Sequence, residues 1–402
     1  PALSVWPLVL GGPELPVLSA RMNLQRLVPR ALLLASAVFV AVQASGEGQA
    51  PRAALRPEPA GPQTAQAMPG DVSVMDLRRL YAGPPQSWPR PLLGPGAQFR
   101  EFAPPPSLPA PGAREKALAA IGKRLFDDPR LSGSGQIACA SCHSPELGLG
   151  DGLRTAFGHD RQRGRRNAQS LYTAAWMTPL FWDGRSPDLA EQALHPITDG
   201  AEMAATAETV LPRLNADTGY RAAYAALGQE RPITMKDVTA ALAAHERTLR
   251  PPRSRWMKVF ENGTGVLTDR ELLGLHLFRT KAGCAACHNG PLLSDQRFHN
   301  LGISFYGRRL EDLGRYEVTG KPEDVGRFRT ASLLGVRKTA PYMHNGLFQT
   351  LDNVVALYNG GGGKDRQQPS GNVPVPSADP LVRKLDLTAD ERAALVAFLE
   401  TL

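Results

Sequence analysis

Every cysteine of this chain stands in one of two nearly identical motifs. The chain has 402 residues and 4 cysteines, and the motifs are Cys139–His143 (CASCH) and Cys284–His288 (CAACH). Four cysteines are too few to hold a chain of this length together through disulfides, so their spacing carries the information. Cys-x-x-Cys-His is the spacing of c-type haem attachment, in which two thiols bond the porphyrin and the histidine ligates the iron.

Two other chemistries use Cys-x-x-Cys pairs. One is a zinc site, and the other is a redox-active disulfide. Zinc would leave the histidine that directly follows each pair without a role, and it would do so twice. Both alternatives stay open here, but the sequence favours haem attachment.

The two motifs belong to a longer repeat. A predicted helix ending in Leu125-Phe126 precedes the first motif, and one ending in Leu277-Phe278 precedes the second. This similarity predicts a duplicated domain, with its boundary in the Pro- and Gly-containing segment 250–265. We therefore expect an N-terminal haem domain over residues 113–255 and a C-terminal haem domain over 256–402.

The apolar pattern predicts a mostly α fold with long loops, because apolar residues recur at helical spacing while strand patterns are nearly absent. Two Ser/Thr-x-x-Glu capping boxes, Thr268 with Glu271 and Thr388 with Glu391, predict two helix starts. The predicted helices cover residues 71–80, 114–126, 188–194, 207–214, 218–226, 234–248, 268–278, 351–358 and 388–402.

The N-terminal part is expected to contain no haem. Residues 22–44 have the basic start, short apolar run and small-residue end of a cleaved export signal, which places the mature protein in the periplasm. An uncleaved membrane anchor is the alternative, and residues 1–21 are interpreted as a start-site artefact. Residues 45–112 form a Pro-rich arm that we expect to lie over a domain surface, because it contains several aromatic residues.

Composition excludes some partners. The chain carries 46 Lys and Arg against 38 Asp and Glu, a formal net charge of +8. No basic run with interleaved aromatic residues is present, so we expect no nucleic-acid partner. After signal cleavage we also expect no stable membrane span, and the positive charge suits an acidic protein partner.

Three further segments resemble the bacterial di-haem cytochrome c peroxidase superfamily, including its MauG-like branch. They are residues 125–132 (LFDDPRLS), 181–185 (FWDGR) and 340–346 (APYMHNG). With the two haem motifs they follow the family's order over residues 114–402. The resemblance implies two covalently bound c haems, a peroxide-reactive one in the N-terminal domain and an electron-transfer one in the C-terminal domain. The implied attachment and ligand residues are Cys139, Cys142, His143, Cys284, Cys287 and His288.

The resemblance also places three residues beside the peroxide-reactive iron. Glu202 matches the family's distal acid, which takes a proton from peroxide and returns it to the leaving oxygen. Gln192 matches a distal amide, and Pro196 matches a position that lines the pocket. Without the resemblance, Glu202 would be interpreted as a solvated acid at a helix start.

Other residues match positions between the two haems. Trp182 matches a tryptophan that lets both irons share charge, although a single tryptophan is usually a core residue. Asn167, Thr339 and Pro341 match an interdomain calcium site, for which oxygen ligands are suitable.

Tyr358 distinguishes the branches of the family. Peroxidases of the superfamily place methionine at this position as the sixth ligand of the electron-transfer haem, whereas the MauG-like branch places tyrosine. A phenolate stabilises oxidised iron, so we expect Tyr358 to ligate the second haem. A buried core tyrosine and ligation by Met343 are the alternatives.

Two positions depart from the MauG-like pattern. His159 matches a loop histidine that some reductively activated peroxidases place on the resting peroxide-reactive iron, so it is a possible ligand there. Ala282 and Gly283 stand where MauG-like proteins carry a surface tryptophan for oxidising a protein substrate. The sequence therefore assigns no electron route to such a substrate.

These matches predict a periplasmic peroxidase-type oxidase that uses hydrogen peroxide. It would oxidise a residue, such as a tryptophan, on a partner protein through a high-valent di-haem state. One alternative is a cytochrome c peroxidase that takes electrons from a small cytochrome or cupredoxin. The other is a non-catalytic di-haem electron carrier, which would need no acid such as Glu202.

Overall fold

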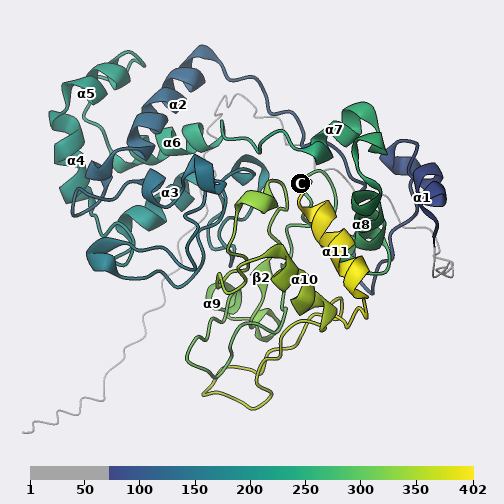
Figure 1. Ribbon diagram of the computed structural model, residues 1–402. Coiled ribbons are helices and arrows are strands. Elements are labelled where there is room, and N and C mark those ends of the chain that lie inside the picture. The colour runs from purple at the N-terminus through teal and green to yellow at the C-terminus, as the bar shows by residue number, and fades with distance from the viewer. Residues whose placement is uncertain (1–71) are drawn as a thin grey trace, which may run out of the picture. The chain divides into compact units, whose positions relative to one another are not determined.

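The structure, a computed structural model, describes residues 72–402, which belong to one compact unit that begins at Ala60. The predicted start-site artefact and signal, and the first part of the arm, lie outside the described residues. The described part is mostly helical, as predicted (Figure 1). Its helices are α1 (Val74–Leu80), α2 (Ala113–Phe126), α3 (Leu189–Thr198), α4 (Ala207–Ala216), α5 (Thr218–Ala225), α6 (Met235–Glu246), α7 (Arg255–Asn262), α8 (Asp269–Arg279), α9 (Tyr316–Thr319), α10 (Leu351–Asn359) and α11 (Ala389–Leu399).

Strand structure is minimal. The named strands among the described residues, β1 (Phe298–His299) and β2 (Phe328–Arg329), form one short antiparallel pair in which Phe298 faces Arg329. The rest of the chain between the helices forms turns and 3₁₀ segments. Most of the residues expected to carry the chemistry are therefore on loops, held in place by the helices around them.

Two helix pairs form the repeated scaffold. Helix α2 packs on α6, and α8 packs on α11. At each crossing a glycine faces a backbone carbonyl: a Cβ added to Gly122 would lie 1.9 Å from the Ala241 oxygen, and one on Gly274 would lie 2.0 Å from the Ala394 oxygen. Only glycine permits so close an approach of two helix backbones. The shared crossing supports the duplication expected from the sequence.

The helix starts follow local chemistry. Both predicted capping boxes are present: Thr268 accepts a hydrogen bond from the backbone of Glu271 at the start of α8, and Thr388 does the same for Glu391 at the start of α11. Each box satisfies two backbone N–H groups that the first helical turn would leave unpaired. Helix α11 ends at Leu399, whereas the sequence analysis predicted that this helix would extend to residue 402.

The segment 250–265, where the boundary between the two haem domains is expected, contains a helix that the sequence analysis did not predict. Helix α7 occupies most of it, starting at Ser254, whose side chain accepts a hydrogen bond from the backbone of Met257. Trp256 of α7 is fully buried against Phe398 of α11. The helix forms because its buried side chains pack on a distant element, which the local Pro and Gly content does not reveal.

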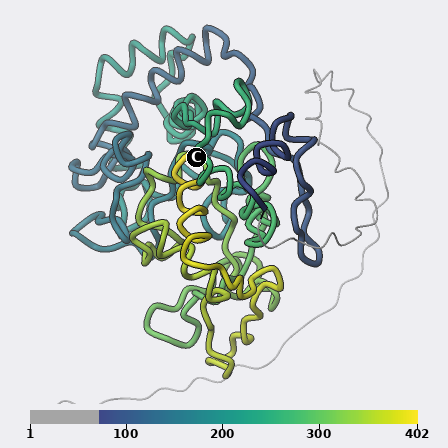
Figure 2. Tube along the Cα trace, turned by 45° about the vertical axis from the view of Figure 1, so that its right-hand side comes forward, coloured from purple at the N-terminus to yellow at the C-terminus, as the bar shows by residue number. Residues whose placement is uncertain are grey.

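The described part of the Pro-rich arm packs against the C-terminal half, beside α8 (Figures 1 and 2). Its aromatic side chains Tyr81, Trp88 and Phe102 are buried. Arg78 donates hydrogen bonds to the carbonyls of Thr264 and Leu267 at 3.2 and 2.9 Å. The arm is thus part of the core of this half.

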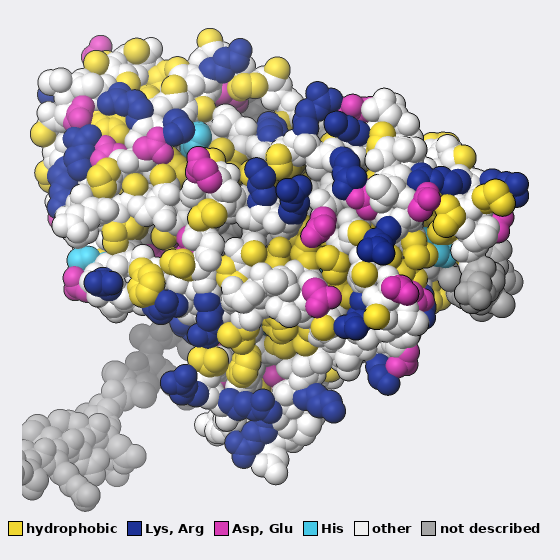
Figure 3. Space-filling view, in the orientation of Figure 1, with side chains coloured by type: hydrophobic (Ala, Val, Ile, Leu, Met, Phe, Trp, Pro, Cys, Tyr) yellow, Lys and Arg dark blue, Asp and Glu magenta, His cyan; other side chains and the backbone are white. Residues whose placement is uncertain are grey.

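On the face shown in Figure 3, basic and acidic side chains are interspersed, with apolar side chains between them. No helix among residues 72–402 is long and apolar enough to cross a membrane.

Candidate haem-binding and active site

One large cavity connects the two Cys-x-x-Cys-His motifs. Its volume is about 690 Å³, and both motifs line its wall. Nearly all the other residues that the sequence analysis assigned to the site line it as well. These are Asn167, Trp182, Gln192, Pro196, Glu202, Thr339, Pro341, Met343 and Tyr358. The fold thus gathers at one cavity residues that are far apart in the sequence.

Both motifs have the same backbone geometry. Each forms a 3₁₀ turn, in which the histidine N–H donates to the carbonyl of the first cysteine, at 3.0 Å for His143 and 2.9 Å for His288. Nδ1 of each imidazole then donates to a backbone carbonyl, that of Leu149 at 2.8 Å and that of Leu293 at 3.0 Å. Because a carbonyl only accepts, Nδ1 carries the proton and Nε2 keeps its lone pair free for a metal ion.

The thiols fit haem attachment better than the alternatives. All four cysteines are free, and burial raises the pKa of Cys139 and Cys284 to about 12. A redox-active pair has a lowered thiol pKa, so the shift opposes a disulfide exchange site. The ligand atoms of Cys287, Asp295 and His299 lie within 4.8 Å of one another. That group contains only one thiol of its pair, whereas zinc in a Cys-x-x-Cys site uses both.

Helix α3 and the turn after it supply the expected distal residues. Gln192 and Pro196 lie on α3, which begins at Asp188, whose carboxylate accepts two backbone N–H groups. Glu202 follows in a turn, where its N–H donates to the Asp199 carbonyl at 3.1 Å. Burial, and then the charge of Asp199, raise the pKa of Glu202, while Arg185 lowers it. A carboxyl group with a raised pKa in a cavity wall is suited to proton transfer near neutral pH.

Trp182 and the predicted calcium residues lie together. The indole N–H of Trp182 donates to the Asn167 carbonyl at 3.0 Å, and its ring packs edge-on against His344, with ring centroids 6.4 Å apart. Asn167 uses its side-chain amide N–H to bond the Leu153 carbonyl, and among residues 72–402 nothing donates to its side-chain oxygen. That oxygen, with Thr339 and Pro341 on the same cavity, is compatible with a hard cation such as calcium.

Tyr358 lies on α10 and faces the second motif. Burial, followed by the charges of Cys287 and Cys284, raises the pKa of its phenol far above the ordinary value. No described residue forms a hydrogen bond with its hydroxyl. Tyr358 lines the cavity on the side of the second motif, so its hydroxyl is available to a metal ion held there. Met343 lines the same cavity from the loop before α10.

His159 is the one predicted site residue that does not line the cavity. Its backbone N–H donates to the Glu202 carbonyl at 2.7 Å, and its imidazole Nε2 lies 3.5 Å from the Asp160 carboxylate. Its buried Nδ1 has no hydrogen-bond partner in the described part of the chain. The neighbouring Gly158 touches Ala201, where a Cβ would lie 2.1 Å from the carbonyl oxygen. The loop therefore supports the turn that carries Glu202.

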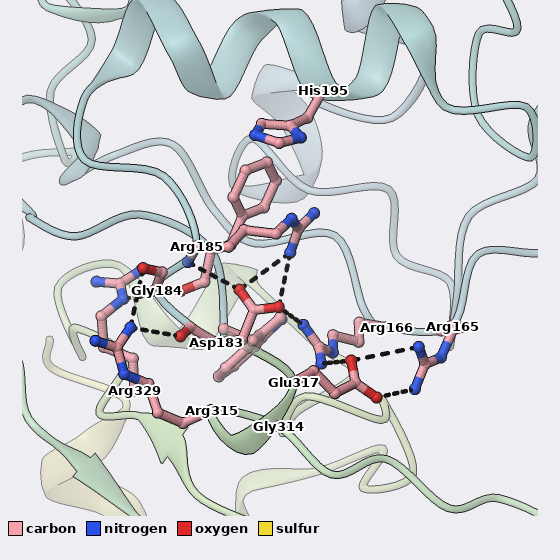
Figure 4. Close-up of polar contacts among 12 residues, drawn as sticks. Arg165, Arg166, Asp183, Gly184, Arg185, His195, Gly314, Arg315, Glu317 and Arg329 are labelled. Carbon is pink, nitrogen blue, oxygen red and sulfur yellow. Dashed lines mark hydrogen bonds and ion pairs between the residues drawn. The ribbon is translucent and has the colours of Figure 1, made fainter. Parts of the chain in front are cut away.

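An arginine network that the sequence analysis missed forms part of the cavity wall. Arg166 pairs with Asp183 and Asp312, and Arg185 pairs with Asp183 at 3.1 Å; Figure 4 shows Asp183 between the two guanidinium groups. Arg329 donates to the Phe181 carbonyl at 3.1 Å. Asp183 and Arg185 belong to the 181–185 segment found in the sequence, whereas Arg166, Asp312 and Arg329 lie far from it along the chain. No local pattern shows that these residues meet.

Within this network, Arg329 is the residue that bears on whether the cavity fits a haem. It is buried, its pKa is lowered to about 10 by burial, and its Nη1 has no hydrogen-bond partner among the described residues. An unpaired buried guanidinium is strongly unfavourable. An anion in the cavity would satisfy it, and a haem carries two carboxylates at one edge. The residues present therefore fit a haem in donor set and in charge.

His299 is a second residue that the sequence analysis missed. Its Nδ1 lies 2.7 Å from the Asp379 carboxylate and its Nε2 lies 2.9 Å from that of Asp295. These hydrogen bonds outweigh burial and raise the pKa of His299 to about 11. The cavity wall near Cys287 thus includes an imidazole whose charged form is stabilised by two carboxylates.

Comparisons with known proteins agree with this geometry. A family model described as di-haem cytochrome c peroxidase matches residues 116–264. The chain is 36% identical to a cytochrome-c peroxidase IdrP1 of Denitromonas iodatirespirans over 76% of this chain and 87% of that protein. It is 39% identical to the methylamine utilization protein MauG of Methylorubrum extorquens over 76% of this chain and 83% of that protein.

The fold is also similar to solved structures of di-haem peroxidases and a MauG-like protein. A MauG-like protein associated with microbial copper homeostasis superposes with a TM-score of 0.65 at 32% identity, covering 75% of this chain and 93% of that chain. The di-haem peroxidase BthA from Burkholderia thailandensis superposes with a TM-score of 0.61 at 26% identity, covering 78% and 95%. The protein is therefore a haem peroxidase-type oxidoreductase, and the chain belongs to the di-haem cytochrome c peroxidase family, which includes MauG.

Proposed function

We propose that this protein is a MauG-like oxidase that uses hydrogen peroxide to oxidise a residue, such as a tryptophan, on a partner protein in the periplasm. It would hold two covalent c haems and one calcium ion. The observation that carries the proposal is Tyr358, buried at the cavity beside the second Cys-x-x-Cys-His motif, where peroxidases of the superfamily have methionine.

The first half would carry out the reaction with peroxide. Cys139, Cys142 and His143 would hold the haem that supplies the redox chemistry with peroxide, and other residues of this half would move the protons. Glu202 would accept a proton from bound peroxide and return it to the leaving oxygen as water forms. Gln192, on the same wall, would orient the peroxide through its amide.

The second half would store an oxidising equivalent. A phenolate ligand from Tyr358 stabilises oxidised iron, whereas a thioether ligand favours the reduced form. Trp182, between the Asn167 carbonyl and His344, is positioned to let the two halves share charge. The non-catalytic carrier is disfavoured, because a buried acid with a raised pKa at an accessible cavity has no role in it.

A second candidate function is a cytochrome c peroxidase that needs prior reduction and draws electrons from a small cytochrome or cupredoxin. The observation that favours it is the His159 loop, which is hydrogen-bonded to Glu202 directly beside the expected peroxide site. In that function, opening of the loop would be the activation step.

Rapid-mixing absorption spectroscopy distinguishes these functions. We expect the diferric wild type to react with peroxide directly, and Tyr358→Met to lose the long-lived oxidised state and raise the potential of one haem. Tyr342→Phe is the matched control, since Tyr342 lines the same cavity but hydrogen-bonds the Val336 carbonyl. A diferric wild type inert to peroxide, with a half-reduced sample that turns over with a reduced cytochrome, would establish the peroxidase function instead.

A further inference from the structure

The arm brings oxidisable aromatic side chains into the core of the C-terminal half. Tyr81 and Trp88 come from the arm, and Trp256 comes from α7. Their rings form one chain of contacts, with centroids 5.3 Å apart between Tyr81 and Trp88 and 6.3 Å apart between Trp88 and Trp256. All three residues are buried, with 0%, 4% and 1% of their surface exposed.

The chain of rings reaches the cavity. Trp256 contacts Phe398 of α11 at 5.5 Å, and Phe398 contacts Phe278 of α8 at 5.3 Å. Phe278 lines the cavity wall near the second motif. Two phenylalanine rings in series, Phe398 and Phe278, therefore separate the first oxidisable ring, Trp256, from the cavity. Phe102 of the arm also contacts both Trp256 and Phe278.

Tyr81, at the far end of the chain, has a proton acceptor in place. Its hydroxyl lies 3.1 Å from Nδ1 of His276, and the contact is buried. Burial raises the pKa of the Tyr81 phenol and lowers the pKa of His276, so both groups are neutral at rest. A neutral imidazole protonated at Nε2 accepts the phenolic proton at Nδ1. A phenol that loses an electron is strongly acidic, so its proton would move along this hydrogen bond.

The hydrogen-bond partners of the two rings favour Tyr81 over Trp88 as the oxidised site. The indole N–H of Trp88 donates to the Gly83 carbonyl at 2.7 Å, and a carbonyl does not take up the proton of an oxidised indole. The positive charge would therefore stay on the Trp88 ring. Tyr81 becomes a neutral radical because its proton, and with it the positive charge, passes to His276.

We propose that this aromatic chain is the electron route between the second haem and the arm, with Tyr81 as the terminal donor and His276 as its proton acceptor. It rests on the proposed function and supplies the route that Ala282 and Gly283, in place of a surface tryptophan, do not provide. It makes the Pro-rich arm part of the redox machinery.

The electrons and protons balance as follows. Reduction of one peroxide to two waters takes two electrons, which cross the chain one at a time, and two protons, which come from solvent. Each electron that crosses the chain leaves a neutral tyrosyl radical at Tyr81 and a proton on His276. A one-electron donor on the partner protein, such as an oxidisable aromatic residue, then returns an electron to Tyr81, and His276 returns the proton.

Electron paramagnetic resonance after rapid mixing of the holoprotein with peroxide tests the route. We expect a tyrosyl radical signal in the wild type and its loss in Tyr81→Phe, which removes only the hydroxyl. Trp256→Phe keeps an aromatic ring in the core and should also abolish the signal; Trp88→Phe serves the same purpose if that variant does not fold. Tyr224→Phe is the matched control, because Tyr224 is equally buried and its hydroxyl donates to the Asp237 carbonyl in the other half.

Two further readouts separate the possible outcomes. Peptide mapping should find peroxide-dependent oxidation at Tyr81, Trp88 and Trp256 in the wild type. The initial absorption change with peroxide should be unaltered in Tyr81→Phe. An unaltered radical signal in both Tyr81→Phe and Trp256→Phe would overturn the route alone, whereas a holoprotein inert to peroxide would overturn both the route and the proposed function.

Discussion

The two halves of this protein share a scaffold and differ in what they bring to it. In each half a glycine on one helix faces an alanine carbonyl on a second helix, and a 3₁₀ turn presents two thiols and an imidazole. The first half adds Glu202 and Gln192 from α3 and the turn after it. The second half adds Tyr358 from α10. In the proposed function the repeated elements would hold the haems, and elements outside the repeat would set what each haem site can do.

The difference extends into the scaffold helices. His245 packs on Phe126 at 5.2 Å in the first half, and Phe398 packs on Phe278 at 5.3 Å in the second. The next residue lines the cavity in both halves, but it is Glu246 in the first and Leu399 in the second. Burial raises the pKa of Glu246 to about 8. Helix α6 of the first half thus carries a buried acid at the position where helix α11 of the second half carries an apolar residue.

The arm adds a further difference between the two halves. It packs with the second half, where Tyr81, Trp88 and Phe102 extend the aromatic core around Trp256. The second half therefore has a continuous set of aromatic rings between its cavity and the arm. This arrangement fits a division in which one half reacts with peroxide and the other exchanges electrons.

The largest expected effect is loss of a haem. If each motif attaches its own haem, the double variant Cys139→Ala/Cys142→Ala and the double variant Cys284→Ala/Cys287→Ala should each lose the mass of one haem. Intact-mass spectrometry measures this directly. A wild type with one haem, or with zinc, would contradict the two-haem assignment.

The next largest effect concerns the acid that only the first half has. Glu202→Gln should slow the reaction with peroxide by about 10²–10⁴-fold, because it removes a general acid–base group. Stopped-flow absorption measures the rate, with haem content unchanged. Glu191→Gln is the control, since Glu191 is on the same helix α3 but does not line the cavity. Equal rates for Glu202→Gln and wild type would make Glu202 a structural acid.

Stability variants test whether the two helix crossings are equivalent. Gly122→Ala and Gly274→Ala should each destabilise the protein by about 1–3 kcal/mol or more, because the added methyl overlaps a backbone carbonyl. Denaturant unfolding followed by circular dichroism measures the loss. Gly200→Ala is the control, since a Cβ there meets nothing within 4 Å. A neutral effect at only one crossing would mean that the two scaffolds pack differently.

The smallest effect, per unit of pH, is a pH dependence specific to the first half. The native pKa of Glu246, about 8, lies above its ordinary 4.5. Between these values the native state holds a proton that the unfolded state releases, so stability falls as pH rises through this window. Glu246→Gln should remove this slope, which is at most about 1.4 kcal/mol per pH unit. Unfolding curves of wild type and variant across this range measure it, and parallel curves would contradict the assignment.

Local chemistry explains what the sequence predicted correctly. The Cys-x-x-Cys-His turns, the capping boxes at Thr268 and Thr388, and most helices depend on residues within a few positions of one another. A capping hydrogen bond or a haem-attachment turn is complete within one short segment, so its pattern is visible without the fold. The resemblance carried by the three further segments then identified the family.

Tertiary structure decided the rest, because the partners involved are far apart in the sequence. Arg329 becomes an unpaired buried cation only where the fold places it in the cavity wall, and His299 becomes charged only between Asp295 and Asp379. Helix α7 forms in a segment with the composition of a linker because Trp256 packs on Phe398. Tyr81 meets His276 because the arm lies along α8. Burial and charge pairing are properties of the assembled chain, so the sequence alone gave the motifs, and only the fold determined their electrostatic environment.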